Sequence, residues 1–117
     1  MSPRTSGRSS AETLLAVQLE QAGIYFEREV LFARGLKRRW RADFLVQPGD
    51  ILIEVEGGLY VAGRHTQGKG YEADLDKYNA AVELGYRVLR YSPRHINDGS
   101  ALEQIRRILS KEDSRAA

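Results

Sequence analysis

Cysteine is absent from the sequence, and its absence excludes several kinds of protein. A chain without thiols has no disulfide scaffold, no thiolate zinc site and no cysteine nucleophile. Long apolar runs are absent too: none approaches the roughly 20 residues of a membrane-spanning helix, and the first residues lack the apolar segment of a signal peptide. We therefore expect an intracellular, cytoplasmic protein with no membrane partner.

The residues that are present are typical of one folded domain. The chain has 117 residues, of which 42% are hydrophobic and 29% are charged, and a chain of this size supports one modest core. Its formal net charge of +2 is compatible with a nucleic-acid partner. We expect a flexible basic arm over 1–9, a single domain over 10–109 and a frayed tail over 110–117.

Hydrophobic periodicity predicts the order helix, three strands, helix, strand, helix. The expected helices cover 11–22, 71–84 and 101–109, and the expected strands cover 25–32, 39–46, 51–56 and 86–91. Short turns join the first three strands, which favours an antiparallel meander, and the helical crossover before the last strand favours parallel pairing. The predicted fold is α/β, a small mixed four-stranded sheet flanked by helices on both faces, in the order αβββαβα.

Two neighbouring strands carry acidic residues on faces that should coincide. Strict alternation along 51–56 gives Glu54 and Glu56 the same face as Leu52. Along 39–46, Asp43 shares its face with Arg39, Arg41 and Leu45. The opposite face of that strand should carry Trp40, Ala42, Phe44 and Val46. A short turn at Pro48 to Asp50 places the two strands side by side, so the sequence predicts three carboxylates on one patch of the sheet.

Such a patch of carboxylates favours a divalent cation. Like charges this close raise one another's pKa and cost stability unless a cation neutralises them. Mg²⁺ prefers oxygen ligands and often takes one or two carboxylates together with water and a substrate phosphate. Asp43, Glu54 and Glu56 therefore predict a site for Mg²⁺ or Mn²⁺ that serves phosphoryl transfer. The structural alternative is that Glu54 and Glu56 form the solvated face of an amphipathic strand.

The spacing Asp43-x10-Glu54-Val55-Glu56 resembles that of the PD-(D/E)XK nuclease superfamily, which has the restriction-endonuclease-like fold. The ordered segments IEVEGG (53–58), GRHTQGKG (63–70) and GYRVLRY (85–91) are more specifically similar to small Vsr-like and phage-borne endonucleases. The similarity extends over about residues 10–109. It implies a divalent-metal-dependent DNA endonuclease that hydrolyses phosphodiester bonds, and it is compatible with a phage origin.

The resemblance also implies roles for individual acids. Asp43 and Glu54 match the two metal-binding acids of the superfamily, and the main-chain carbonyl of Val55 is a further candidate ligand. Glu12 corresponds to the acid often found in the first helix. Its alternative role is to compensate the helix dipole in the first turn.

Glu56 stands where the superfamily pattern usually has a lysine. An acid at this position would act as a further ligand or as a general base. Another cation is then expected to replace the lysine, and we favour His65 and Lys77 over Lys69 as catalytic residues. The structural alternatives are an ordinary loop position for His65 and a solvated helix position for Lys77.

Basic and glycine-rich segments flank the predicted acidic patch. The segment GRHTQGKG nearly matches a phosphate-binding P-loop, but Gly70 replaces the hydroxyl residue that should hold Mg²⁺, so we expect no nucleotide cofactor. Positive charge before and along the Asp43 strand would contact DNA phosphates independently of base sequence. The residues concerned are Arg34, Lys37, Arg38, Arg39 and Arg41, and the expected DNA-binding set is Arg39, Arg41, Arg64 and Lys69.

The sequence leaves open what such an enzyme would recognise, and it allows two rival functions. A chain of this size is expected to recognise a DNA structure, such as a junction or a flap, or to act as a homodimer. A noncatalytic DNA-binding or assembly module on the same scaffold is the rival interpretation, and the acid in the lysine position favours it. An RNA-cleaving enzyme is the other rival interpretation.

Overall fold

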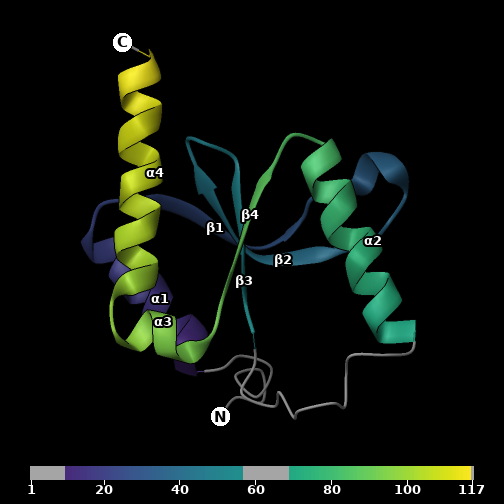
Figure 1. Ribbon diagram of the computed structural model, residues 1–117, viewed down its shortest axis with the longest axis horizontal. Helices are drawn as coiled ribbons and strands as arrows, with labels where there is room; N and C mark the ends of the chain where they lie inside the picture. Colours follow the sequence, from purple (N-terminus) through teal and green to yellow (C-terminus); the bar gives the residue numbers. More distant parts are fainter. Residues whose placement is uncertain (1–9, 57–68, 117) are drawn as a thin grey trace.

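The fold is built on a mixed sheet with the strand order β1-β2-β3-β4. The computed structural model describes residues 10–56 and 69–116 (Figure 1). The strands are β1 (Tyr25–Leu31), β2 (Arg41–Gln47), β3 (Ile51–Val55) and β4 (Arg87–Tyr91). β2 pairs antiparallel with β1 and β3, whereas β4 pairs parallel with β3. The predicted meander and the predicted parallel strand after the helical crossover are therefore confirmed.

Helices cover both faces of this sheet, as the sequence predicted. In Figure 1, α1 (Ser10–Gln21), α3 (Pro93–Asn97) and α4 (Ser100–Ala116) lie on one side of the strands, and α2 (Lys69–Glu83) lies on the other. A single 3₁₀ turn, η2 (Arg34–Leu36), lies between β1 and β2. None of the helices in the described part of the chain is long and apolar enough to cross a membrane.

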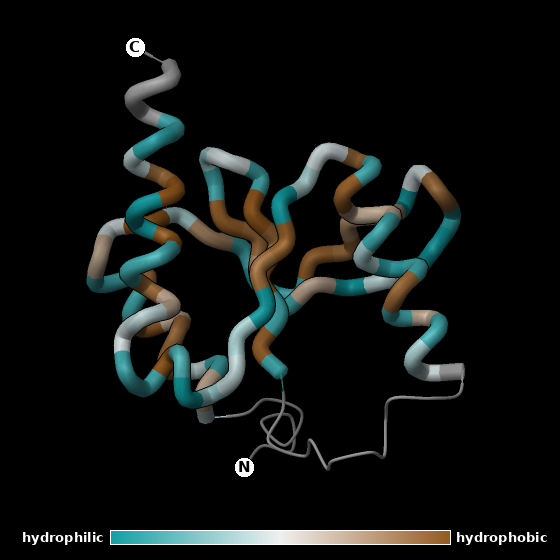
Figure 2. Tube along the Cα trace, viewed as in Figure 1, coloured by the Kyte–Doolittle hydropathy of each residue, from teal (hydrophilic) through white to brown (hydrophobic). Residues whose placement is uncertain are grey.

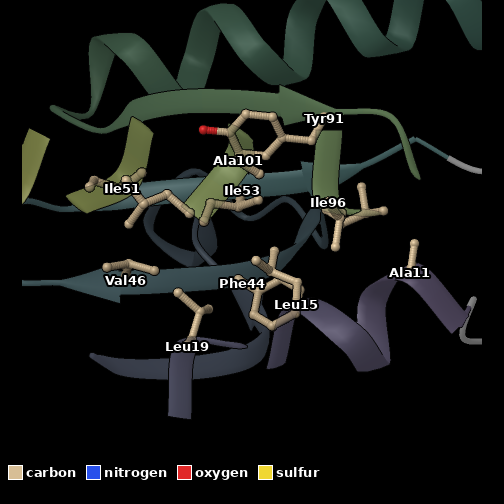
Figure 3. Close-up of a cluster of buried hydrophobic side chains, with 12 residues drawn as sticks. Ala11, Leu15, Leu19, Phe44, Val46, Ile51, Ile53, Tyr91, Ile96 and Ala101 are labelled. Carbon is tan, nitrogen blue, oxygen red and sulfur yellow. The ribbon is translucent and has the colours of Figure 1, made fainter. Parts of the chain in front are cut away.

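The larger hydrophobic core lies between the sheet and the α1, α3 and α4 helices. Leu15 and Leu19 of α1, one turn apart, are fully buried against Phe44 and Ile53 of the strands, and Ile96 of α3 closes the cluster (Figure 3). Burying one side chain of this kind stabilises the fold by about 1.5–3 kcal/mol. Figure 2 shows hydrophobic residues concentrated along the central strands, whereas hydrophobic and hydrophilic residues are interspersed along the helices.

A smaller core lies on the opposite face of the sheet and positions α2. Leu45 and Leu52 of the strands are buried there with Phe32 and Ala33, which follow β1, and with Ala81 of α2. Ala81 is fully buried, whereas the other α2 residues whose side chains the structure describes are exposed or half-buried, so the helix contacts the strands along a narrow line. This contact brings the polar residues of α2 to the sheet face that carries Glu54.

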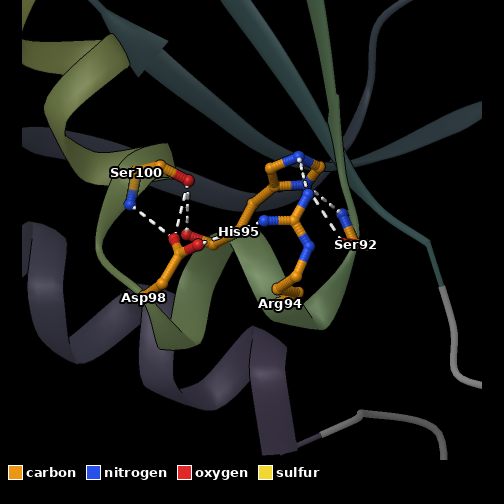
Figure 4. Close-up of polar contacts among 5 residues, drawn as sticks. All are labelled: Ser92, Arg94, His95, Asp98 and Ser100. Atoms are coloured by element: carbon orange, nitrogen blue, oxygen red, sulfur yellow. Dashed lines mark hydrogen bonds and ion pairs between the residues drawn. The ribbon is translucent and has the colours of Figure 1, made fainter.

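The segment 93–99 was expected to be a connection, but it contains the short helix α3. Pro93 is its first residue, where proline's missing N–H is harmless, and the N–H of Ser92 donates to Nδ1 of His95 at 3.0 Å. Asp98 then accepts the N–H of Ser100 at 2.9 Å, where α4 begins (Figure 4). A five-residue helix is too short to show periodicity, and histidine replaces the acid or amide of the usual capping pattern.

Most element bounds agree with the predicted ones to within two residues, but α4 is longer than expected. The apolar periodicity ends at Leu109, where we predicted that the helix would end. The helix continues to Ala116. An ion pair between Glu112 and Arg87 of β4 ties this extension to the sheet, and such a long-range contact leaves no signal in local hydrophobicity.

The faces of β2 differ from the predicted alternation at its first residues. Glu29 of β1, opposite Asp43, adopts a left-handed φ of 52°, and the strand ladder is interrupted there. Phe44 packs into the larger core, whereas Trp40 and Ala42 pack into the smaller core near α2. The prediction that Trp40 and Ala42 share a face with Phe44 is therefore wrong, because it assumed an unbroken pleat.

Candidate active site

Asp43 and Glu54 are brought together by the antiparallel pairing of β2 and β3. The register pairs Phe44 with Ile53, and extending it by one residue places Asp43 opposite Glu54. Side chains in such positions have Cβ atoms about 5 Å apart. Glu54 also shares its strand face with Leu52, which packs toward α2. The two acids therefore lie side by side on the α2 face of the sheet.

A main-chain hydrogen bond fixes the carboxylate of Asp43. The N–H of Val55 donates to Oδ2 of Asp43 at 2.8 Å. Backbone pairing between β2 and β3 ends at Phe44 and Ile53, so the carboxylate satisfies an N–H beyond the last paired residue. The bond is charge-assisted and holds the Asp43 side chain in one orientation.

Lys77 reaches Glu54 from α2. Its Nζ lies 2.9 Å from Oε2 of Glu54, and the two side chains are only 15% and 14% exposed. The Lys77 ammonium is therefore a direct, largely buried ionic partner of the Glu54 carboxylate. Lys77, one of the two cations that we favoured for the lysine position, therefore lies beside Glu54. The other, His65, lies outside the described residues.

Burial makes both carboxylates reluctant to ionise. The pKa of Glu54 is raised from 4.5 to about 7. Desolvation is the main cause, the neighbouring Asp43 and Glu56 contribute to the rise, and the Lys77 ammonium opposes it. Desolvation also raises the pKa of Asp43, although the Val55 N–H and Lys77 lower it. The pair is therefore a spot where a further positive charge would be strongly stabilised.

Glu56 follows β3 and is held by a different partner. Its Oε2 accepts a hydrogen bond from Nε of Arg90 at 2.8 Å, and both side chains are nearly half exposed. The Arg90 guanidinium also stacks on the ring of Tyr78 of α2, with 4.4 Å between Cζ and the ring centroid. Glu56 thus shares the face of Asp43 and Glu54, but it is engaged with Arg90.

Glu12 is positioned by α1, the helix that packs on the other face of the sheet. It is buried, at 8% exposure, and its Oε1 lies 3.6 Å from a terminal nitrogen of Arg28 in β1. Arg28 in turn stacks on the Phe44 ring, 4.7 Å from its centroid. Glu12 therefore pairs with Arg28, a cation on the side of the sheet that α1 covers.

The predicted DNA-binding cations fall into two groups. Arg41 pairs with Glu29 across β1 and β2 at 3.4 Å, and Arg39 is exposed in the connection before β2. Arg64 and His65 lie outside the described residues, as does the side chain of Lys69, the first residue of α2.

The donor set of this site fits a hard divalent cation. Asp43 and Glu54 supply carboxylate oxygens from two rigid strands, and Mg²⁺ commonly takes one or two carboxylates and fills its remaining positions with water and phosphate. Within residues 10–56 and 69–116, no three carboxylate or imidazole groups converge closely enough to hold a metal ion. The described residues therefore bring two carboxylates together, those of Asp43 and Glu54. The third predicted ligand, Glu56, pairs with Arg90 in this structure.

Sequence reasoning missed Arg90 and Tyr78 as neighbours of the acids. The parallel register of β3 and β4 pairs Glu54 with Arg90. This pairing could have been inferred by aligning Leu52 with Val88, the apolar residues that precede them on the two strands. Tyr78 adjoins Lys77 in α2, and its ring lies against the Arg90 guanidinium.

A comparison with solved structures finds the catalytic domain of the homing endonuclease I-Bth0305I. The match has a TM-score of 0.64 and 20% sequence identity, and it covers 86% of this chain and 94% of that domain. Searches against protein-family models and curated proteins find no match. The mixed four-stranded sheet flanked by helices is therefore a nuclease-like fold.

Proposed function

We propose that this chain is a divalent-metal-dependent DNA endonuclease of the PD-(D/E)XK type that hydrolyses phosphodiester bonds. The observation that carries the proposal is the pair of carboxylates, Asp43 and Glu54, opposite one another on neighbouring strands and shielded from water. The fold shared with a homing endonuclease catalytic domain supports it. Two desolvated acids cost stability on their own, so their pairing favours a function that needs them.

Asp43 and Glu54 would hold Mg²⁺ or Mn²⁺ in this enzyme. The bound ion would polarise the scissile phosphate and lower the pKa of the attacking water. The Val55 N–H orients one oxygen of Asp43, which leaves the carboxylate preorganised for a ligand role. Arg39, Arg41, Arg64 and Lys69 are the proposed DNA contacts.

Lys77 would provide the positive charge that the superfamily pattern usually takes from its strand lysine. In the protein alone, Lys77 neutralises Glu54. With DNA bound, the same ammonium would lie beside the phosphate and stabilise the charge that develops during hydrolysis. Glu56, His65 and Glu12 complete the proposed catalytic set.

Cleavage of supercoiled plasmid tests the proposal, with Mg²⁺, Mn²⁺ or excess EDTA in parallel reactions. We expect nicked and linear products only with the divalent ions. Asp43→Asn and Glu54→Gln should each lower the rate by roughly 100-fold or more, since even outer-sphere partners of a metal cost 10- to 100-fold. The matched controls are Asp76→Asn and Glu83→Gln, exposed acids of α2 that should leave the rate unchanged.

The same assay separates this proposal from its rivals. Binding of DNA without cleavage under any divalent ion would favour the noncatalytic module, and faster cleavage of matched RNA would favour a ribonuclease. Flap and four-way duplexes test the expected preference for a DNA structure. Sedimentation of the protein with and without such a duplex tests the expected homodimer.

A further inference from the structure

The connection between β1 and β2 forms a shallow hollow of about 450 Å³. It is lined by Leu31, Arg34, Lys37, Arg38 and Arg39, so four of its five lining residues are cations. All four are exposed. We call this feature the β1–β2 cation hollow. Figure 1 shows the connection on the same side of the sheet as α2, where Phe32 and Ala33 pack with Ala81 of that helix.

Among the described residues, no acid pairs with the positive charges of the hollow. Most arginines of the strands pair with acids: Arg28, Arg41, Arg87 and Arg90 each lie within 4.0 Å of a carboxylate. In the described part of the chain, no carboxylate lies at ion-pair distance from the four cations of the hollow. Four uncompensated positive charges within six residues repel one another. Such a cluster is stabilised by an external anion.

A hydrogen-bonded turn fixes the backbone of the hollow, and the residue before this turn is buried in the smaller core. The 3₁₀ turn η2 begins after the buried Ala33, and the N–H of Lys37, which has a left-handed φ of 60°, donates to the carbonyl of Arg34 at 2.8 Å. The Arg38 guanidinium stacks on the Trp40 ring, 4.8 Å from its centroid. Less side-chain freedom therefore remains to be lost when an anion binds.

We propose that the β1–β2 cation hollow binds the sugar–phosphate backbone of DNA beside the cleavage site. The inference rests on the proposed function, because it takes DNA as the ligand. Arg39 precedes Asp43 by four residues, so an extended chain separates their Cα atoms by at most about 14 Å. Each DNA strand has one phosphate per 3.4 Å of helix axis, so this distance corresponds to about four nucleotides on one side of the cleavage site.

The chemistry of the hollow suits phosphate and not base edges. Arginine presents a planar fork of donors that binds phosphate oxygens in pairs, whereas lysine acts as a point charge. Contacts of this kind fix the position of the duplex and carry no base sequence information. The hollow would therefore set affinity and register, while the Asp43–Glu54 pair performs the chemistry.

Fluorescence anisotropy of a labelled 24-base-pair duplex in EDTA tests the proposal without cleavage. The variant Arg34→Gln/Lys37→Gln removes two charges from the hollow. The matched control Arg106→Gln/Lys111→Gln removes two exposed charges from α4, on the other side of the sheet. We expect the slope of log K against log salt to fall by about 1.8 for the hollow variant. Its affinity at 0.1 M salt should fall at least about tenfold, and the control should match the wild type.

A charge-conserving variant shows whether a loss of DNA binding comes from the lost charge or from misfolding. Arg34→Lys/Lys37→Arg should keep the wild-type slope, and all variants should show the same thermal midpoint. In the plasmid assay, the Gln variant should raise KM and leave kcat unchanged. An unchanged salt slope, an equal loss in the α4 control, or no DNA binding by the wild type would each overturn the proposal.

These assays test DNA binding by the hollow and DNA cleavage by the enzyme separately, so either proposal can fail without the other. A wild type that never cleaves DNA, together with a hollow variant that binds it more weakly, would support the hollow and contradict the nuclease. Metal-dependent cleavage by the wild type, together with a hollow variant that binds as tightly as the wild type, would contradict the hollow and support the nuclease.

Discussion

The buried carboxylate of Glu54 makes the stability of the metal-free protein depend on pH. Its pKa is about 7 in the folded protein, against 4.5 for an ordinary glutamate. The folded state therefore binds the Glu54 proton more tightly than the unfolded state. The resulting stability is fully present below pH 4.5 and is lost as the pH rises through 7. We expect Glu54→Gln to remove this dependence, because Gln cannot ionise.

The size of the effect follows from the same two values. The difference between 4.5 and about 7 corresponds to about 3 kcal/mol of unfolding free energy. Since the Glu54 side chain is only 14% exposed, solvent screens little of this penalty. A loss of about 3 kcal/mol is a large part of the 5–15 kcal/mol that stabilises a typical domain.

Urea unfolding at intervals from pH 4.5 to 8.5, with EDTA present, measures this difference. The unfolding free energy of the wild type should fall relative to that of Glu54→Gln by about 3 kcal/mol over the range. The control Glu83→Gln, an exposed acid of α2, should follow the wild type. Parallel curves for the wild type and Glu54→Gln would refute the argument that burial controls this carboxylate.

Three further substitutions test other parts of the structure. Lys77→Met should cost about 3–5 kcal/mol of unfolding free energy at pH 8, because it leaves the Glu54 carboxylate buried without its cation; an unchanged urea midpoint would contradict this. Phe44→Ala should cost about 3–5 kcal/mol through the cavity in the larger core, and a loss below 1 kcal/mol would count against the packing. Gly85→Ala should cost about 1–2 kcal/mol by thermal unfolding, since φ is +100° there and a Cβ meets nothing within 4 Å; equal midpoints would exclude backbone strain as the cause.

The topology could be predicted from the sequence because local and global signals agree. β3 alternates cleanly, and its apolar residues Ile51, Ile53 and Val55 all enter the larger core. The turn before it and the helical crossover after it leave few ways to pair the strands. The short turn also predicts that β2 and β3 pair as neighbours, and this pairing brings Asp43 beside Glu54 although the alternation of β2 is interrupted.

Features that depend on contacts between distant residues could not be predicted in this way. Glu56 was predicted to be a further metal ligand or a general base, and the residues around it in the sequence do not indicate that the parallel pairing of β3 and β4 brings Arg90 beside it. The altered faces at the start of β2 depend on the backbone of Glu29 in another strand. Lys77 was one of two cations favoured for the lysine position, and its contact with Glu54 depends on how α2 packs on the sheet.

The central claim is that Asp43 and Glu54 together hold a divalent ion. Crystals grown with Mn²⁺ and measured at its absorption edge test this claim most directly, because the anomalous signal locates the ion independently of any assay. We predict one peak within coordination distance of both carboxylates, and its loss in Asp43→Asn. A Mn²⁺ peak elsewhere, with Lys77 still paired to Glu54 and no ion at Asp43, would contradict the claim.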